Sequence, residues 1–104
     1  MKPYRLRPSA REDRRAEVLY YRHEAGAKVA AKLVEALSKA LVELEVNPAI
    51  GSPTLGKEIG VEGLRTWRID GFPLSLLYFK RSEHVHGVRL IGQRQDQGDL
   101  VIKG

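Results

Sequence analysis

GAKVAAKLVEALSKALVELEVNP, residues 26–48, carries the clearest secondary-structure signal of this 104-residue chain. Apolar residues recur in it at spacings of three and four, which places them in one stripe along an α-helix. Gly26 breaks the pattern on one side, and Asn47-Pro48 ends it on the other because the residue before a proline is disfavoured in a helix. We therefore predict a long helix between Gly26 and Asn47 that packs against both a sheet and another helix. Its main stripe is Ala27, Ala30, Val34, Leu37, Leu41 and Leu44, flanked by Val29, Leu33, Ala36 and Ala40.

The segment before Gly26 predicts a short strand and a first helix. Residues 2–7 alternate apolar and basic side chains, as a half-buried strand does. Ser9 is a favourable N-cap residue, and the acids at positions 12 and 13 suit the start of a helix. We place this helix at about Ser9 to Glu24 and expect it to form an antiparallel hairpin with the second helix. Its thin apolar side consists of Ala16, Leu19, Tyr20 and His23.

After Pro48 the pattern becomes strand-like. An irregular connection over residues 50–63 is followed by three predicted strands at 64–70, 72–81 and 85–93, of which the second is nearly all apolar. Asp70-Gly71 predicts the tightest kind of hairpin turn, and the apolar run Leu100–Ile102 could add a strand end. The predicted fold class is α+β. It comprises an N-terminal strand and an antiparallel helical hairpin packed on a mainly antiparallel sheet with a C-terminal three-strand meander.

Length and composition bound the architecture and the class of partner. A chain of 104 residues with 42% hydrophobic content suits one core and is too short for two, so residues 1–104 are expected to form a single domain. The absence of cysteine excludes disulfides and thiolate sites. The 18 basic and 13 acidic residues give a net charge of +5, which favours an acidic partner or a polyanion. Without a membrane-length apolar segment or a signal peptide, we expect no membrane partner and a cytoplasmic location.

Most catalytic signatures are missing from the sequence. The serines lack the setting of a hydrolase nucleophile, and the glycines at 51–60 precede a predicted strand instead of opening a helix, as a phosphate-binding loop would. His84 and His86 would face one side of a strand, but no third ligand is evident, so we interpret them as turn histidines. We expect no metal site and no cofactor.

Arginine is the residue type that the sequence places most pointedly. A cluster of arginines on the meander could stabilise the charge of a phosphoryl transfer or hold phosphates or an acidic protein by bidentate contacts. It could equally be a solvated sheet edge with cross-strand ion pairs. A metal-independent ribonuclease would also need a general acid and base, for which Tyr78 and His86 are the local candidates. The arginines are Arg65, Arg68, Arg81, Arg89 and Arg94.

Several segments in this order resemble the ParE branch of the ParE/RelE toxin superfamily from bacterial type II toxin-antitoxin systems. The resemblance covers nearly the whole chain. The last strand is followed by Arg94 and Asp96, as in the family, but Gln93 stands where the family often has a histidine, so no histidine role carries over. The matching segments are Tyr4-Arg5-Leu6, the first helix with Asp13 and Tyr20, the Gly26 break, Asn47 to Pro53, Gly63 to Ile69, Phe72 to Phe79 and Val88 to Ile91.

The resemblance implies a small toxin neutralised by a ParD-like antitoxin, in a hetero-oligomeric complex that contacts DNA only through the antitoxin. A helix of the antitoxin would lie against the helical hairpin and its acidic residues would meet arginines. The expected contacts with the target or the antitoxin are Arg65, Arg68, Arg81, Arg89, Arg94 and Asp96. The expected antitoxin-facing residues of the helices are Arg11, Arg14, Arg15, Leu19 and Arg22.

Three functions are compatible with this resemblance. The one we favour is a non-enzymatic toxin that acts by binding, with DNA gyrase as the target that ParE-like members are associated with. The second is a RelE-like, ribosome-dependent mRNA endoribonuclease using Arg65, Arg89 and Arg94. The third is an inactive homologue that serves as a corepressor with its antitoxin.

Overall fold

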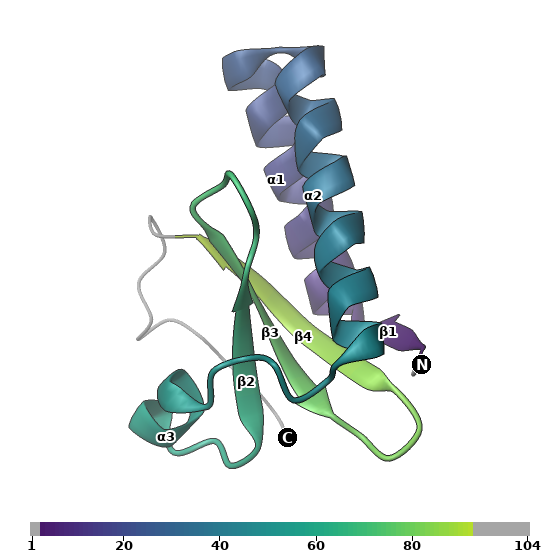
Figure 1. Ribbon diagram of the computed structural model, residues 1–104. Coiled ribbons are helices and arrows are strands. Elements are labelled where there is room, and N and C mark those ends of the chain that lie inside the picture. Colours follow the sequence, from purple (N-terminus) through teal and green to yellow (C-terminus); the bar gives the residue numbers. More distant parts are fainter. Residues whose placement is uncertain (1–2, 93–104) are drawn as a thin grey trace.

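Two long helices form an antiparallel hairpin that extends beyond the sheet (Figure 1). The computed structural model describes residues 3–92, and in it α1 spans Pro8–Ala25 and α2 spans Ala27–Val46. Gly26 alone joins them, with φ 94° and ψ 168°. Only glycine adopts this conformation readily, so the break that the sequence predicts at Gly26 is a backbone requirement.

The sheet has four strands in the order β1-β4-β3-β2. Strand β1 (Tyr4–Leu6) runs parallel to β4 (Val85–Gly92), whereas β4, β3 (Leu74–Lys80) and β2 (Leu64–Arg68) pair antiparallel. The predicted strands, hairpin and meander are therefore confirmed. The predicted run at 100–102 lies outside the described residues.

The side chains of consecutive residues of β3 pack in two separate cores, one on each face of the sheet. Leu76 and Tyr78 pack with α2 in the larger core. Leu77 and Phe79 belong to a second cluster, which includes Leu55 of the short helix α3 (Thr54–Ile59). The sequence predicts an irregular connection in place of α3, because six residues that include a glycine give too short a pattern for a helix to be recognised.

The buried face of α1 differs from the predicted one. Leu19 and Tyr20 are 52% and 42% exposed, while Ala10 and Glu17 are buried at 1% and 4% exposure. Ser9 is not the N-cap, which is Arg7, and Pro8 occupies the first helical position. The prediction was wrong because it assumed that the buried face is the apolar one.

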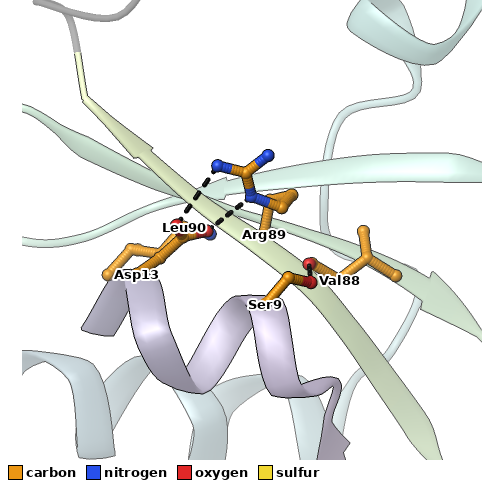
Figure 2. A network of polar contacts seen from close by, with 5 residues as sticks. All are labelled: Ser9, Asp13, Val88, Arg89 and Leu90. Atoms are coloured by element: carbon orange, nitrogen blue, oxygen red, sulfur yellow. Dashed lines mark hydrogen bonds and ion pairs between the residues drawn. The ribbon is translucent and has the colours of Figure 1, made fainter. Parts of the chain in front are cut away.

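Polar side chains of α1 form hydrogen bonds with backbone groups of β4 beyond the point where β1 ends (Figure 2). The Ser9 hydroxyl donates to the Val88 carbonyl at 2.9 Å, and Asp13 Oδ2 accepts from the Leu90 backbone N–H at 3.0 Å. Asp13 also accepts from Arg89 Nε at 2.6 Å and from a terminal guanidinium nitrogen at 3.2 Å. Asp13 therefore takes the place of a neighbouring strand, which explains why a charged residue lies on the sheet side of α1.

A buried tyrosine anchors the connection between α2 and β2. The Tyr78 hydroxyl donates to the Pro48 carbonyl at 2.7 Å and accepts from the Gly51 N–H at 2.9 Å. A Cβ at position 51 would lie 2.4 Å from this hydroxyl, so the close approach requires glycine. Burial raises the pKa of Tyr78, because it disfavours the phenolate. The connection is thus held by side-chain contacts with the sheet.

The turn after β2 is wider than predicted. The Ile69 N–H donates to the Leu74 carbonyl, which leaves four residues in the loop instead of the two expected from Asp70-Gly71. Gly71 has φ 81°, so it provides a positive φ inside this longer loop.

Candidate functional site

A groove of about 440 Å³ lies between α1 and α2 next to β1. Most of its lining is apolar, and three arginines of α1 add positive charge. The apolar residues are Tyr4, Val18, Leu19, Val34, Leu37 and Leu41, the basic ones are Arg11, Arg14 and Arg15, and Ser38 completes the lining.

The helical repeat explains how the groove combines these two chemistries. Arg11, Arg14 and Arg15 are three and four residues apart, so they project from the same side of α1. Leu19 and Val34, one on each helix, remain 52% and 48% exposed. Large apolar side chains that share one concave, exposed surface mark an interaction site. The groove is therefore suited to an amphipathic segment with acidic residues.

An open strand edge adjoins the groove. Strand β1 is the outermost strand of the described sheet, and the residues that flank it, Pro3 and Arg7, direct backbone groups to β4. Because backbone groups alternate along a strand, those of Tyr4 and Leu6 point to the outer edge. Tyr4, Arg11 and Arg14 line both the groove and a smaller hollow along this edge. A partner could therefore continue from the groove onto the strand edge.

The groove brings together four of the five residues predicted to face an antitoxin: Arg11, Arg14, Arg15 and Leu19. Arg22 is exposed on α1 but does not line the groove. Tyr4 and Val18 were not predicted as site residues, and the stripe of Val34, Leu37 and Leu41 was expected to face the core. The available signal was that α2 has two apolar stripes, which exceed what one packing surface needs.

Two of the predicted sheet arginines, Arg65 and Arg89, lie on opposite faces of the sheet. Arg65 pairs with Tyr78 and Arg89 pairs with Leu77. Cross-strand partners project from the same face, and consecutive residues of β3 project from opposite faces. Arg65 and Arg89 therefore leave the sheet on opposite sides, which argues against a shared phosphate-binding cluster.

Both of these arginines have structural partners. Arg65 donates to the carbonyls of Gly51 at 2.7 Å and Ala49 at 3.2 Å, which fixes the connection after α2. Arg89 is paired with Asp13, which raises the pKa of Arg89. Of the others, Arg68 is exposed at the end of β2 and Arg81 lies over the Phe79 ring at 4.5 Å from its centroid. Arg94 and Asp96 lie outside the described residues.

The structure also shows the surroundings of the two candidate acid–base residues, Tyr78 and His86. Tyr78 is fully buried and its hydroxyl is held by Pro48 and Gly51, so it cannot reach a substrate. His86 accepts from Arg7 Nε at 2.8 Å and lies against His84, with ring centroids 5.5 Å apart. Among residues 3–92, no group of three or more histidine or acidic side chains could hold a metal ion.

Comparisons with known proteins identify the family. The family described as "ParE toxin of type II toxin-antitoxin system, parDE" matches residues 4–97. The chain belongs to this family. Its function at the family level is that of a type II toxin, and a ParE toxin has an antitoxin as partner.

A solved structure shares the ParE fold. The structure described as "Chromosomal ParDE TA system from P. aeruginosa" matches with a TM-score of 0.73 at 21% sequence identity, over 88% of this chain and 96% of that chain. Comparison with curated protein sequences gave no match. No helix in the described part of this ParE-family chain is long and apolar enough to cross a membrane.

Proposed function

We propose that this ParE-family chain is a toxin that acts by binding DNA gyrase and that a ParD-like antitoxin neutralises it at the helical-hairpin groove. The observation that carries the antitoxin site is the apolar groove with Arg11, Arg14 and Arg15 along it. Gyrase is the target associated with ParE-like toxins. Action by binding is supported by the structural roles of Arg65, Arg89 and Tyr78, which are engaged within the fold instead of facing a substrate.

The antitoxin segment that fits this surface is an amphipathic helix followed by an extended stretch. The apolar side of the helix would cover Leu19, Val34 and Leu37, and its acidic side chains would pair with the arginines. The extended stretch would add to β1 at the outward backbone groups of Tyr4 and Leu6. The net charge of +5 favours rapid association with such an acidic partner.

Charge reversal tests the antitoxin site. The Arg11→Glu/Arg15→Glu variant should arrest growth on induction even when the antitoxin is co-expressed, because its groove now repels acidic residues. The matched control is Arg22→Glu/Lys28→Glu, which reverses two exposed charges outside the groove lining and should remain neutralised. Equal neutralisation of both variants would contradict the site.

The target is tested in the same cultures and with purified protein. We expect altered DNA supercoiling with intact transcripts, and inhibition of gyrase in a plasmid supercoiling assay. Rapid mRNA cleavage with unchanged supercoiling would support the endoribonuclease instead. No arrest from the wild-type chain without antitoxin would support the corepressor.

A further inference from the structure

Positive charge gathers at one end of the sheet, on the face away from the groove. Arg5 lies opposite His86 in the parallel pair of β1 and β4, and His86 lies opposite Phe79 of β3. Cross-strand partners share a face, so Arg5 and His86 project from the side where Phe79 packs with Leu55 of α3. Tyr4, the neighbour of Arg5, projects to the groove instead. The sheet therefore lies between His86 and the groove, whereas Arg5 also lines the hollow along the β1 edge together with Tyr4 and Arg11.

Direct contacts join three of the basic side chains, those of Arg7, His84 and His86. Arg7 Nε donates to His86 Nε2 at 2.8 Å, and the rings of His84 and His86 meet edge to face with centroids 5.5 Å apart. Arg81 lies over the Phe79 ring. We call Arg5, Arg7, Arg81, His84 and His86 the sheet-end basic patch.

The strands that carry the patch contribute no negative charge, and the acids of the segment that packs on the same face are Glu58 of α3 and Glu62. Strands β1, β3 and β4 have no acidic residue in their sequences, and Glu83 is the one acid between residues 80 and 92. Burial lowers the pKa of His86, and the positive charges of Arg7, Arg81 and Arg5 lower it further. Such a concentration of like charge favours the binding of an anion.

We propose that the sheet-end basic patch binds the phosphodiester backbone of a nucleic acid. Arginine forks match phosphate oxygens, and contacts with phosphates supply affinity without needing apolar surface. A protein partner would instead need apolar anchors. The large exposed apolar side chains of the described residues lie on the three helices, at Ile50 and at Tyr4, which projects to the other face. The patch shares only Arg5 with the hollow along β1 that adjoins the proposed antitoxin groove, and it would give the toxin its own contact with nucleic acid.

Salt-dependent binding tests the patch on the full-length protein. Fluorescence anisotropy with labelled 20-nucleotide single-stranded DNA and RNA and a 20-base-pair duplex would give the slope of log K against log salt concentration. Each lost phosphate contact reduces that slope by about 0.7 to 0.9. We expect Arg5→Gln/Arg81→Gln to reduce it by about 1.4 to 1.8 and to weaken binding equally for unrelated sequences. The matched control, Arg15→Gln/Arg22→Gln, removes two charges from α1 and should leave the slope within about 0.3 of the wild type.

Three results would overturn the proposal. The first is an equal slope change in the two double variants, which would indicate a general charge effect. The second is binding of polyglutamate through Arg5 and Arg81 more tightly than of DNA or RNA, which would assign the patch to an acidic protein. The third is no detectable binding by the wild type at 50 mM salt. Because the groove variants are scored by antitoxin neutralisation, failure here would leave the proposed function intact.

Discussion

Asp13 shows how one side chain can replace a stretch of strand. It accepts from the Leu90 backbone N–H and from Arg89 at the edge of β4 that β1 does not reach. Its side chain is 15% exposed and that of Arg89 is 22% exposed, so both charges are largely removed from water. A pair in this setting is weak as a net source of stability but costly to break. The contacts of this one side chain therefore fix α1 to the sheet.

Removal of the Asp13 carboxylate should destabilise the fold. In Asp13→Ala the Leu90 N–H and the Arg89 guanidinium lose their acceptor, and we expect the free energy of unfolding to fall by about 2–4 kcal/mol. In a double-mutant cycle with Arg89→Met, urea denaturation should give a coupling energy of about 1–3 kcal/mol. The exposed pair Lys39–Asp70 serves as the control and should show much weaker coupling. Additive effects at Asp13 and Arg89 would show that the pair does not act as a unit.

The Tyr78 hydroxyl offers a second test at this scale. Tyr78→Phe keeps the ring but leaves the Gly51 N–H and the Pro48 carbonyl without this partner. We expect a loss of about 1–3 kcal/mol in the free energy of unfolding, measured by chemical denaturation. Tyr4→Phe removes a hydroxyl from a residue that is 41% exposed and should change stability by less than about 0.5 kcal/mol. A Tyr78→Phe variant as stable as Tyr4→Phe would show that the buried network adds nothing.

At the scale of elements, α1 and α2 differ in what their buried faces contain. The buried face of α2 is apolar and includes Leu33, Leu37 and Leu44. The sheet side of α1 uses Ala10, Asp13 and Glu17, while Leu19 and Tyr20 point outward. Val18 and Tyr21 pack against the core, whereas Leu19 stays exposed and lines the groove. Helix α1 thus supplies half of the residues that line the groove.

The hairpin turn gives a prediction for the pair of helices. Gly26 has φ 94° and ψ 168°, a region that is almost exclusive to glycine, whereas Gly60 has φ 75° and ψ 25° in the left-handed region that asparagine tolerates. Gly26→Asn should therefore lower the free energy of unfolding by about 1–3 kcal/mol. Gly60→Asn should cost less than about 1 kcal/mol. Neither added Cβ meets an atom within 4 Å, so backbone conformation is the sole difference. Equal thermal and chemical stability of the two variants would contradict this reasoning.

At the scale of the whole molecule, the chain presents two surfaces of different chemistry on opposite sides of one sheet. The groove combines apolar residues and arginines beside α1 and α2, and the sheet-end basic patch is polar throughout. Strand β1 contributes to both, because Tyr4 projects to one side and Arg5 to the other. A helix in the groove would lie on the Tyr4 side of β1, whereas a segment added along the strand edge would also pass Arg5.

The pH dependence of global stability should report on the patch. The pKa of His86 is lowered from its ordinary value of 6.5, so the unfolded chain binds a proton at His86 more readily than the folded one. This contribution to stability is fully present above about pH 6.5 and is lost as the pH falls toward the lower, folded pKa. In His86→Gln, whose amide oxygen can still accept from Arg7, stability should fall less between pH 7 and pH 5.5. Parallel stability curves for the two proteins, measured by urea denaturation, would contradict the assignment.

Local patterns in the sequence are enough to predict most of the elements. The three- and four-residue spacing between Gly26 and Pro48, the apolar run at 72–81 and the alternation at 85–93 predict α2, β3 and β4. These patterns work because burial of one face imposes the same period on the sequence as on the backbone. The arginines of α1 are expected to face an antitoxin because of the family resemblance, and that expectation stays a prediction.

The tertiary structure was needed wherever a residue's role depends on a distant partner. Asp13 faces inward because the edge of β4, 77 residues away, needs an acceptor, and Gly51 is required because Tyr78 approaches it. The same holds for Arg65 and Arg89, whose side of the sheet follows from strand register and whose partners lie 14 and 76 residues away. Sequence periodicity records whether a side chain is buried, but not what it meets. Contacts between remote segments fix that, and only the folded chain brings those segments together.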